Sequence, residues 1–149
     1  MRYFTGAGGG RNIVVNLSKG EDILEGIGAA CRAMNVRDAV IVGAVGSARK
    51  MRYHYVASTA DDPENVFVTV DRACEIGALQ GLILSGDVHV HAAFSDAAGR
   101  AYNGHLEPGC EVLYLLEVTL IELPDLRLKR YLDEYGVCYI DHCREGELA

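Results

Sequence analysis

Three of the five histidines in this chain fall in one short stretch, at His89, His91 and His105. Side chains of a β-strand alternate between the two faces of a sheet, so His89 and His91 point to the same side if residues 88–94 form a strand. The apolar and β-branched composition of these residues predicts that strand. Three neutral imidazoles that meet at one point suit Zn²⁺ or another borderline divalent metal. The alternative is a polar strand face with separately hydrogen-bonded histidines, because His-x-His recurs by chance.

Whether His105 joins the other two depends on the loop between the two strands. Residues 95–99 have turn composition, and residues 100–106 are predicted to be the returning strand. An odd-numbered loop centred near Ala97 places His105 opposite His89 and diagonal to His91, on one shared face. An even-numbered loop turns His105 to the other face and removes the site. On the first condition, the three imidazoles are close enough for one ion to bridge them, and the separately hydrogen-bonded histidines stay the alternative.

A metal site of this kind is catalytic only if an acid or base lies near it. Zinc with three protein ligands keeps a fourth position, where the pKa of a water is lowered to about 7. Glu107 and Glu117 are the candidate catalytic residues, with Asp96 more remote. Alternatively, Glu107 begins a turn, and Glu117 pairs with an arginine inside the sheet or across a subunit boundary. His54, on an alternating strand, is expected to be an exposed surface residue and not a ligand.

The composition indicates one globular domain over residues 1–149, with a core over about 10–130 and a polar C-terminal tail. Half of the 149 residues are hydrophobic and 23% are charged. No apolar run approaches the roughly 20 residues of a membrane span, and the first residues lack the apolar region of a signal peptide. A cytoplasmic location is therefore expected. The net charge of −7 opposes unaided binding to nucleic acid.

The five cysteines include no Cys-x-x-Cys pair. Cys31, Cys74 and Cys110 have apolar neighbours and are expected to be small buried residues. Cys138 and Cys143 flank His142 and could bind metal or form a disulfide. Reduced thiols in a frayed tail are the preferred interpretation.

One helix is predicted to follow a first strand over residues 12–17. Ser18 and Glu21 have the spacing of a capping box. Apolar residues then recur at helical spacing as far as about Asn35. They are Ile23, Leu24, Ile27, Ala30, Cys31 and Met34.

Strands dominate the rest of the chain. They are predicted over residues 38–48, 51–56, 66–70 and 74–84, followed by the two histidine strands and residues 110–123. Gly43 and Gly46 within the first of these indicate a bulge or a close backbone approach. The last strand is apolar on both faces, so a helix is expected to cover one side and a second subunit the other. The fold class is α+β, with one main helix on a mostly antiparallel sheet of about seven strands.

The order of several motifs resembles a known family. They are a strand leading to Gly20-Glu21-Asp22 and a helix, AVIVGAVGS at 39–47, Arg72-x-x-Glu75-Ile76, Leu79-x-Gly81, His89-Val90-His91, Asn103-Gly104-His105-Leu106, Pro108-Gly109 and Glu117-Val118. Over residues 10–130 they resemble the PPC domain, the plant and prokaryote conserved domain found beside AT-hooks in plant nuclear proteins and alone in bacteria and archaea. The resemblance implies an α+β subunit that forms a homotrimer. In prokaryotic members it implies a metal, usually zinc, held by the motif histidines, here His89, His91 and His105.

Three details qualify this resemblance. Asn103 stands where the family usually has glycine, and its side chain could point toward the metal. Arg72 and Glu75 lie on opposite faces of a strand, so they need not pair, and a structural role at a subunit boundary is expected. No Arg-Gly-Arg-Pro AT-hook is present, and residues 8–11 (GGGR) do not replace one.

Three functions are consistent with these observations. The first is a metal-stabilised homotrimer that binds a small-molecule ligand or a protein partner. The alternative is a metal-dependent hydrolase or lyase that uses the open zinc position. DNA binding, which the family label suggests, is disfavoured because a trimer would carry three times the charge of −7.

Overall fold

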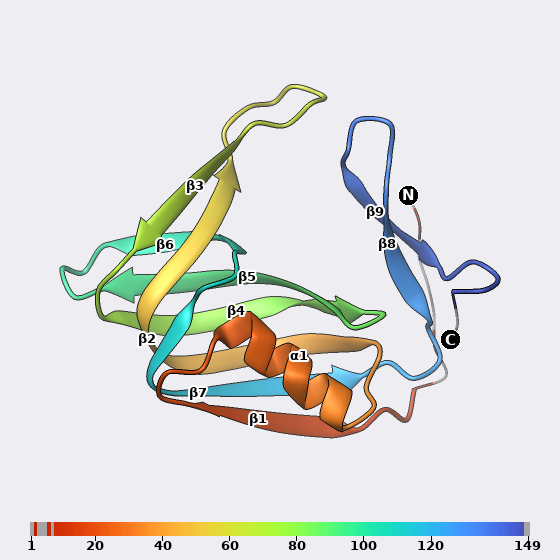
Figure 1. Ribbon diagram of the computed structural model, residues 1–149, viewed down its shortest axis with the longest axis horizontal. Helices are drawn as coiled ribbons and strands as arrows, with labels where there is room; N and C mark the ends of the chain where they lie inside the picture. The colour runs from red at the N-terminus through yellow and green to blue at the C-terminus, as the bar shows by residue number, and fades with distance from the viewer. Residues whose placement is uncertain (1, 3–5, 7, 148–149) are drawn as a thin grey trace.

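The computed structural model describes residues 2, 6 and 8–147 and confirms the α+β fold class. One helix packs on a seven-stranded antiparallel sheet of order β1-β7-β2-β4-β5-β6, with β3 paired to β2, and a separate hairpin follows (Figure 1). The elements are β1 (Asn12–Ser18), α1 (Ile23–Ala33), β2 (Ala39–Val56), β3 (Asn65–Val70), β4 (Cys74–Leu84), β5 (Asp87–Asp96), β6 (Ala101–Leu106), β7 (Glu111–Glu122), β8 (Leu128–Leu132) and β9 (Cys138–His142).

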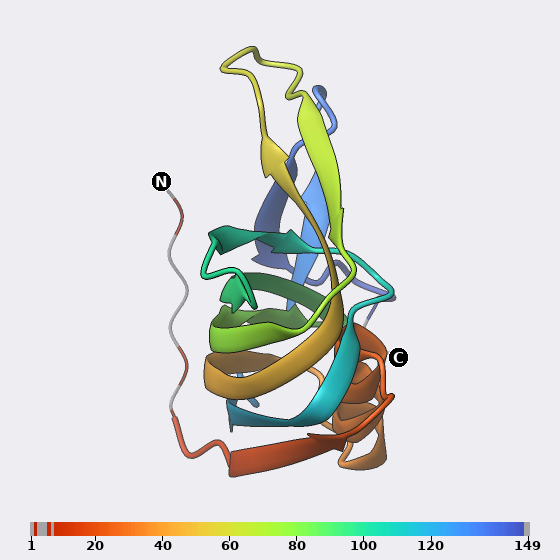
Figure 2. The ribbon, with the colours of Figure 1, turned by 90° about the vertical axis from the view of Figure 1, so that its left-hand side faces the viewer.

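Helix α1 covers one face of the sheet, and its apolar stripe builds the core. Ile23 and Ile27 are fully buried, and Leu17 and Leu116 face them from the strands. Figure 2 shows the helix on one side of the curved stack of strands, which leaves an opposite, outer face. The predicted buried cysteines, Cys31, Cys74 and Cys110, all lie in the core.

The predicted capping box at Ser18 is wrong. The side chain of Asp22 accepts the hydrogen bond from the backbone N–H of Glu25 and is the N-cap. Ser18 is still the last residue of β1, and its own N–H donates to the Glu21 carboxylate. Carboxylate and hydroxyl caps have similar preference at this position, so the spacing alone could not choose between them.

Strand β2 runs unbroken where the sequence predicted two strands. Its first half pairs with β4 and β7, and its second half pairs with β3 and β6. The pairing with β7 shifts register between Ile41 and Gly43 and again between Gly46 and Ala48, which confirms the predicted bulge. A Cβ at Gly46 would lie 2.3 Å from the carbonyl oxygen of Leu115. The strand therefore bends and lies along two different parts of the sheet.

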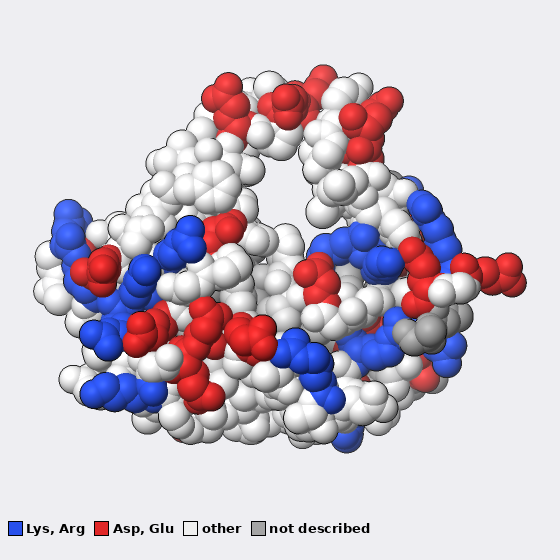
Figure 3. Space-filling view, viewed as in Figure 1, with Lys and Arg blue, Asp and Glu red and all other residues white. Residues whose placement is uncertain are grey.

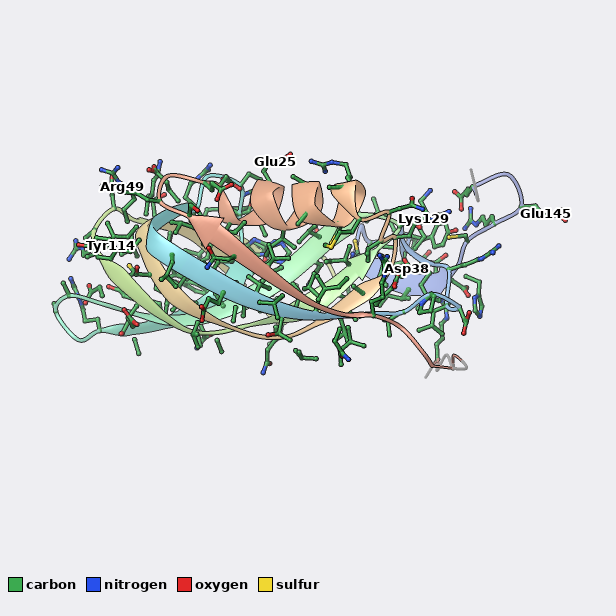
Figure 4. All side chains as sticks on the ribbon, turned by 90° about the horizontal axis from the view of Figure 1, so that it is seen from below. Glu25, Asp38, Arg49, Tyr114, Lys129 and Glu145 are labelled. Atoms are coloured by element: carbon green, nitrogen blue, oxygen red, sulfur yellow. The ribbon has the colours of Figure 1, made fainter. Side chains whose placement is uncertain are left out.

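The C-terminal segment, for which the sequence predicted a polar tail, forms a hairpin of β8 and β9. The carboxylate of Asp38, itself only 3% exposed, accepts hydrogen bonds from the backbone N–H groups of Leu128 and Ser85. Leu128 is buried against the rest of the molecule. Figure 4 shows Asp38 at the junction between the sheet and the hairpin. The local sequence pattern did not predict this hairpin, because polar residues alternate along it and its contacts are with residues distant in sequence.

Within the described residues, no helix has the length and apolar character to cross a membrane. The expectation that the first residues lack the apolar region of a signal peptide concerns mainly positions that the structure does not describe.

We predict that Gly81→Ala destabilises the fold and Gly77→Ala does not, although both glycines lie in β4. A Cβ at Gly81 would lie 2.0 Å from the carbonyl oxygen of His89, whereas the nearest atom to a Cβ at Gly77 is 3.9 Å away. Overpacking against a backbone should lower the free energy of unfolding by about 1–3 kcal/mol for Gly81→Ala, measured by urea denaturation. Gly77→Ala should change it by less than about 0.5 kcal/mol. Equal effects of the two substitutions would contradict this packing of β4 on β5.

Candidate metal centre

His89, His91 and His105 converge on the outer face of the sheet. Val90, between the first two, is fully buried on the helix side, so the flanking imidazoles point away from the core. The ring centroid of His105 lies 4.6 Å from that of His89 and 5.4 Å from that of His91. One ring nitrogen from each of the three histidines lies within 4.8 Å of the others. This is the convergence that a shared ion requires.

The pairing of β5 with β6 differs by two residues from the predicted register. His105 lies opposite His91, not opposite His89, and the last pair before the loop is Ser95 with Ala101. The loop is therefore centred on Ala98 instead of Ala97. The number of loop residues remains odd, so all three histidines still share one face.

Asp96 holds this loop in place. One carboxylate oxygen accepts the backbone N–H groups of Ala98 and Arg100, and the other accepts the hydroxyl of Tyr102 and Nε of Arg100. Arg72 forms an ion pair with the same carboxylate at 3.6 Å, so its partner is Asp96 and not Glu75. Burial would raise the pKa of Asp96, but these hydrogen bonds and the Arg100 charge outweigh it and hold the pKa at about 2. Asp96 is thus a structural anchor and lies away from the histidines.

The environment of the cluster favours the neutral form of two of its imidazoles, His89 and His105. Desolvation, followed by the nearby charge of Arg130, lowers the pKa of His89 to about 4. Desolvation, followed by the effect of His54, also lowers the pKa of His105. A neutral imidazole has a lone pair on one nitrogen, which is the form that binds a metal. The donor set therefore fits a borderline divalent ion such as zinc.

His54 belongs to this neighbourhood, and the prediction that it is an exposed surface residue is wrong. It lies opposite His105 in the pairing of β2 with β6, and the two rings stack with centroids 4.5 Å apart. Its Nδ1 is 2.7 Å from a carboxylate oxygen of Glu107, and only 19% of its side chain is exposed. His54, His105 and Glu107 form a second close group of possible metal ligands. No sequence pattern predicts this pairing, because it depends on the bend of β2.

Gly104 explains how β6 can approach β2 so closely beside the cluster. A Cβ on Gly104 would lie 2.5 Å from the carbonyl oxygen of His54 and 2.7 Å from the ring of Tyr53. The glycine before His105 is therefore required by packing. Asn103, where the family usually has another glycine, pairs with Ala93 and lies beside His91 on the outer face.

The two candidate catalytic carboxylates have different surroundings. Glu107 lies at the end of β6, next to His54 and His105. Glu117 lies on β7, which β2 and β4 separate from β5, and it pairs with Asn16 and Val45. Only Glu107 is placed to act at the histidine cluster.

The C-terminal cysteines do not form a close ligand group with His142. Within the described part of the chain, the two clusters above are the ones whose donor atoms lie within 4.8 Å of each other. Cys138 is exposed on β9, and Sγ of Cys143 lies 3.4 Å from the hydroxyl of Ser85. Both are free thiols on an ordered hairpin, which corrects the prediction of a frayed tail.

Comparison with known proteins identifies the family. Residues 4–124 match the model of the Plants and Prokaryotes Conserved (PCC) domain. The chain belongs to this family, also called PPC. Two curated relatives, both named bifunctional protein GlmU, from two Synechococcus strains, are 28% and 29% identical over 119 residues. These residues are 80% of this chain but only 18% of either relative, so the chain spans about a fifth of their length.

Solved structures share this PPC fold. A metal-containing protein from Archaeoglobus fulgidus has a TM-score of 0.81 at 24% identity, covering 93% of this chain and 97% of that one. A PPC protein from Pyrococcus horikoshii has a TM-score of 0.78 at 23% identity, with 91% and 94% covered. A suspected DNA-binding protein from Bacteroides thetaiotaomicron has a TM-score of 0.77 at 18% identity, with 93% and 96% covered. At these identities the likeness establishes the fold.

We predict that acid destabilises the metal-free protein partly through His89. Its pKa of about 4 in the folded state lies below the 6.5 of an ordinary histidine, so between these values the unfolded chain binds a proton that the folded chain does not. The free energy of unfolding should therefore fall as the pH decreases from 6.5 to 4, and this part of the slope should be absent from His89→Asn. Nuclear magnetic resonance titration of the His89 ring gives the pKa directly. A midpoint near 6.5 would contradict the desolvated environment.

Proposed function

We propose that this PPC domain binds one zinc ion per chain through His89, His91 and His105. We further propose that it forms a homotrimer whose metal site receives a small-molecule ligand or a protein partner. The convergence of three imidazoles on one face, with the pKa of His89 and His105 lowered by desolvation, is the observation that carries this proposal. The metal-containing relative from Archaeoglobus fulgidus supports it through the shared fold.

Bound zinc would supply a Lewis acid with a position left for an exchangeable ligand. The chain itself fixes where that position lies. The buried Val90 orients His89 and His91, and the stacking of His54 against His105 limits how far the third ring can turn. The outer face also has a pocket of about 500 Å³ that begins at His89 and His91. A small ligand can therefore reach the histidines from one side.

The homotrimer is supported by the apolar side chains on the outer face. Monomeric proteins rarely expose large apolar patches that no partner covers. Helix α1 lies on the other side of the sheet, as Figure 4 shows, and no described element covers this part of the outer face. The exposed residues here are Val14, Val42, Val45, Tyr114, Leu115 and Ile121.

Nucleic acid is not proposed as a partner, because the basic residues have acidic neighbours. Arg49 pairs with Glu111, and Lys129 pairs with Glu147. Acidic side chains also gather at the tips of the β2–β3 arm and the β8–β9 hairpin, on either side of the gap seen in Figure 3. Lys and Arg gather at the left end of the face in Figure 3, but Asp and Glu lie among them, and binding to phosphate depends on an excess of Lys and Arg.

Native mass spectrometry of the zinc-loaded protein measures both the assembly and its metal content. We expect a trimer with one zinc per chain for the natural protein, and a trimer without zinc for His91→Ala. His142→Ala is the matched control, since this histidine lies on the hairpin outside the cluster, and it should keep its zinc. Zinc retained by His91→Ala but lost from His142→Ala would overturn the metal site. A mass of one chain at micromolar concentration would overturn the trimer.

The contact between His54 and Glu107 favours a second candidate function, a metal-dependent hydrolase or lyase. The Glu107 carboxylate holds Nδ1 of His54 at 2.7 Å, which fixes the orientation of the ring. The other ring nitrogen is then available to move a proton beside His105. Neither residue is needed to complete the three-histidine set, so the dyad is free to act on a ligand beside it.

Two glutamate variants test the hydrolytic function. We expect zinc-loaded protein to hydrolyse 4-nitrophenyl acetate, and Glu107→Gln to lower the rate by about a hundredfold while zinc content is unchanged. Glu117→Gln, on distant β7, should leave the rate unchanged. If Glu107→Gln and Glu117→Gln hydrolyse the ester at the same rate as the natural protein, the dyad is not catalytic.

A further inference from the structure

The pocket beside the metal cluster has walls from two separate parts of the chain. Gln80 and Leu82 of β4 and His89 and His91 of β5 form one wall. The β8–β9 hairpin forms the other, with Arg130, Cys138 and Ile140. This hairpin begins after residue 124, where the family match ends. The family assignment alone therefore does not specify this half of the pocket.

The hairpin wall is fixed to the sheet, so the pocket is a built feature. Asp38 binds the backbone at the start of β8, and the side chain of Arg130 forms the second attachment. Arg130 donates from Nη2 to the carbonyl oxygen of Leu82 at 2.9 Å, and from Nη1 to the carboxylate of Asp87 at 2.8 Å. Since Leu82 is the strand partner of His89, the guanidinium lies next to the histidine cluster.

The charge of this pocket is positive. Arg130 is the one charged residue among the described residues that line it, and only 9% of its side chain is exposed. Asp87, which pairs with Arg130, does not line the pocket, and 67% of its side chain is exposed. Water therefore screens the negative charge of this carboxylate more than the positive charge of the guanidinium. A divalent ion on the neutral histidines would add to the positive charge. A cationic pocket favours an anionic occupant.

The guanidinium also has donors left for a ligand. Its hydrogen bonds to described residues are three, to the carbonyl oxygen and carboxylate of Asp87 and to the carbonyl oxygen of Leu82. A guanidinium has more N–H groups than these bonds use, and Arg is the side chain that best matches the geometry of a carboxylate or phosphate. The apolar side chains of Leu82 and Ile140 complete the walls.

We propose that this pocket binds a small organic molecule with an oxyanion group, a carboxylate or a phosphate, next to Arg130. The inference rests on the proposed metal site, because the bound ion would supply part of the positive charge of the pocket. The pocket volume of about 500 Å³ lies in the range of small-molecule sites, so the occupant is a compact metabolite and not a macromolecule. Arg130 selects the anionic group, and the metal-bearing histidines lie where the rest of the ligand, or a second oxygen of the anion, can reach them.

Isothermal titration with defined probes tests this inference. Butyrate and inorganic phosphate represent the two oxyanions, and butyramide is the neutral isostere of butyrate. The zinc content of every sample is measured first, so a failure to bind zinc is separated from a failure to bind the anion. The variants are Arg130→Gln, which removes the charge, and Asp87→Asn, which removes the competing carboxylate. Arg49→Gln is the control, because Figure 4 places Arg49 at the opposite end of the molecule from the hairpin.

We expect zinc-loaded protein to bind at least one oxyanion and not butyramide. Arg130→Gln should weaken this binding by about tenfold or more with zinc content unchanged, and Arg49→Gln should leave it unchanged. Asp87→Asn retains Arg130 and should bind the anion several-fold more tightly, which keeps the test valid if Arg130→Gln loosens the hairpin. Equal binding of butyrate and butyramide, no binding of either oxyanion to zinc-loaded protein, or unchanged affinity in both pocket variants would overturn the proposal.

Discussion

The arrangement of the candidate site depends on one buried carboxylate. Asp96 accepts hydrogen bonds from the loop that joins β5 to β6 and thereby fixes the register of these strands. Because strand side chains alternate, a shift of one residue in this pairing would turn His105 to the opposite face. The carboxylate is far from the histidines, yet it decides whether three imidazoles meet. Asp96, which the sequence suggested as a remote acid or base, therefore has a structural role at the site.

The parts of the site set by local rules were predictable from the sequence. The two-residue spacing of His89 and His91 requires a shared face in any strand, and the odd loop length brings His105 to it. The fold class also follows from local patterns, since the helix of residues 23–33 and most strands show their periodicity. The centre of the loop was wrong by one residue, because hydrogen bonds to Asp96, and not composition, select the turn.

The parts set by contacts between distant residues were not predictable. His54 joins the cluster only because β2 bends at its bulges and pairs with β6. The C-terminal hairpin looked like a polar tail, and its attachment through Asp38 and Arg130 leaves no periodic signal. Both features lie beside the histidines and remove water from His89 and His105, which explains the lowered pKa of these two residues. The chemistry of the site is therefore set as much by these neighbours as by the three ligands.

Partial burial of the His89 and His105 imidazoles costs free energy unless they gain a partner, and a metal ion shared with His91 is the partner that the geometry fits. Anomalous diffraction at the zinc edge, from crystals grown with zinc, tests this most directly. The account predicts a strong peak bonded to ring nitrogens of His89, His91 and His105. A peak at Cys138, His142 and Cys143 instead, or no peak near the three histidines, would contradict it.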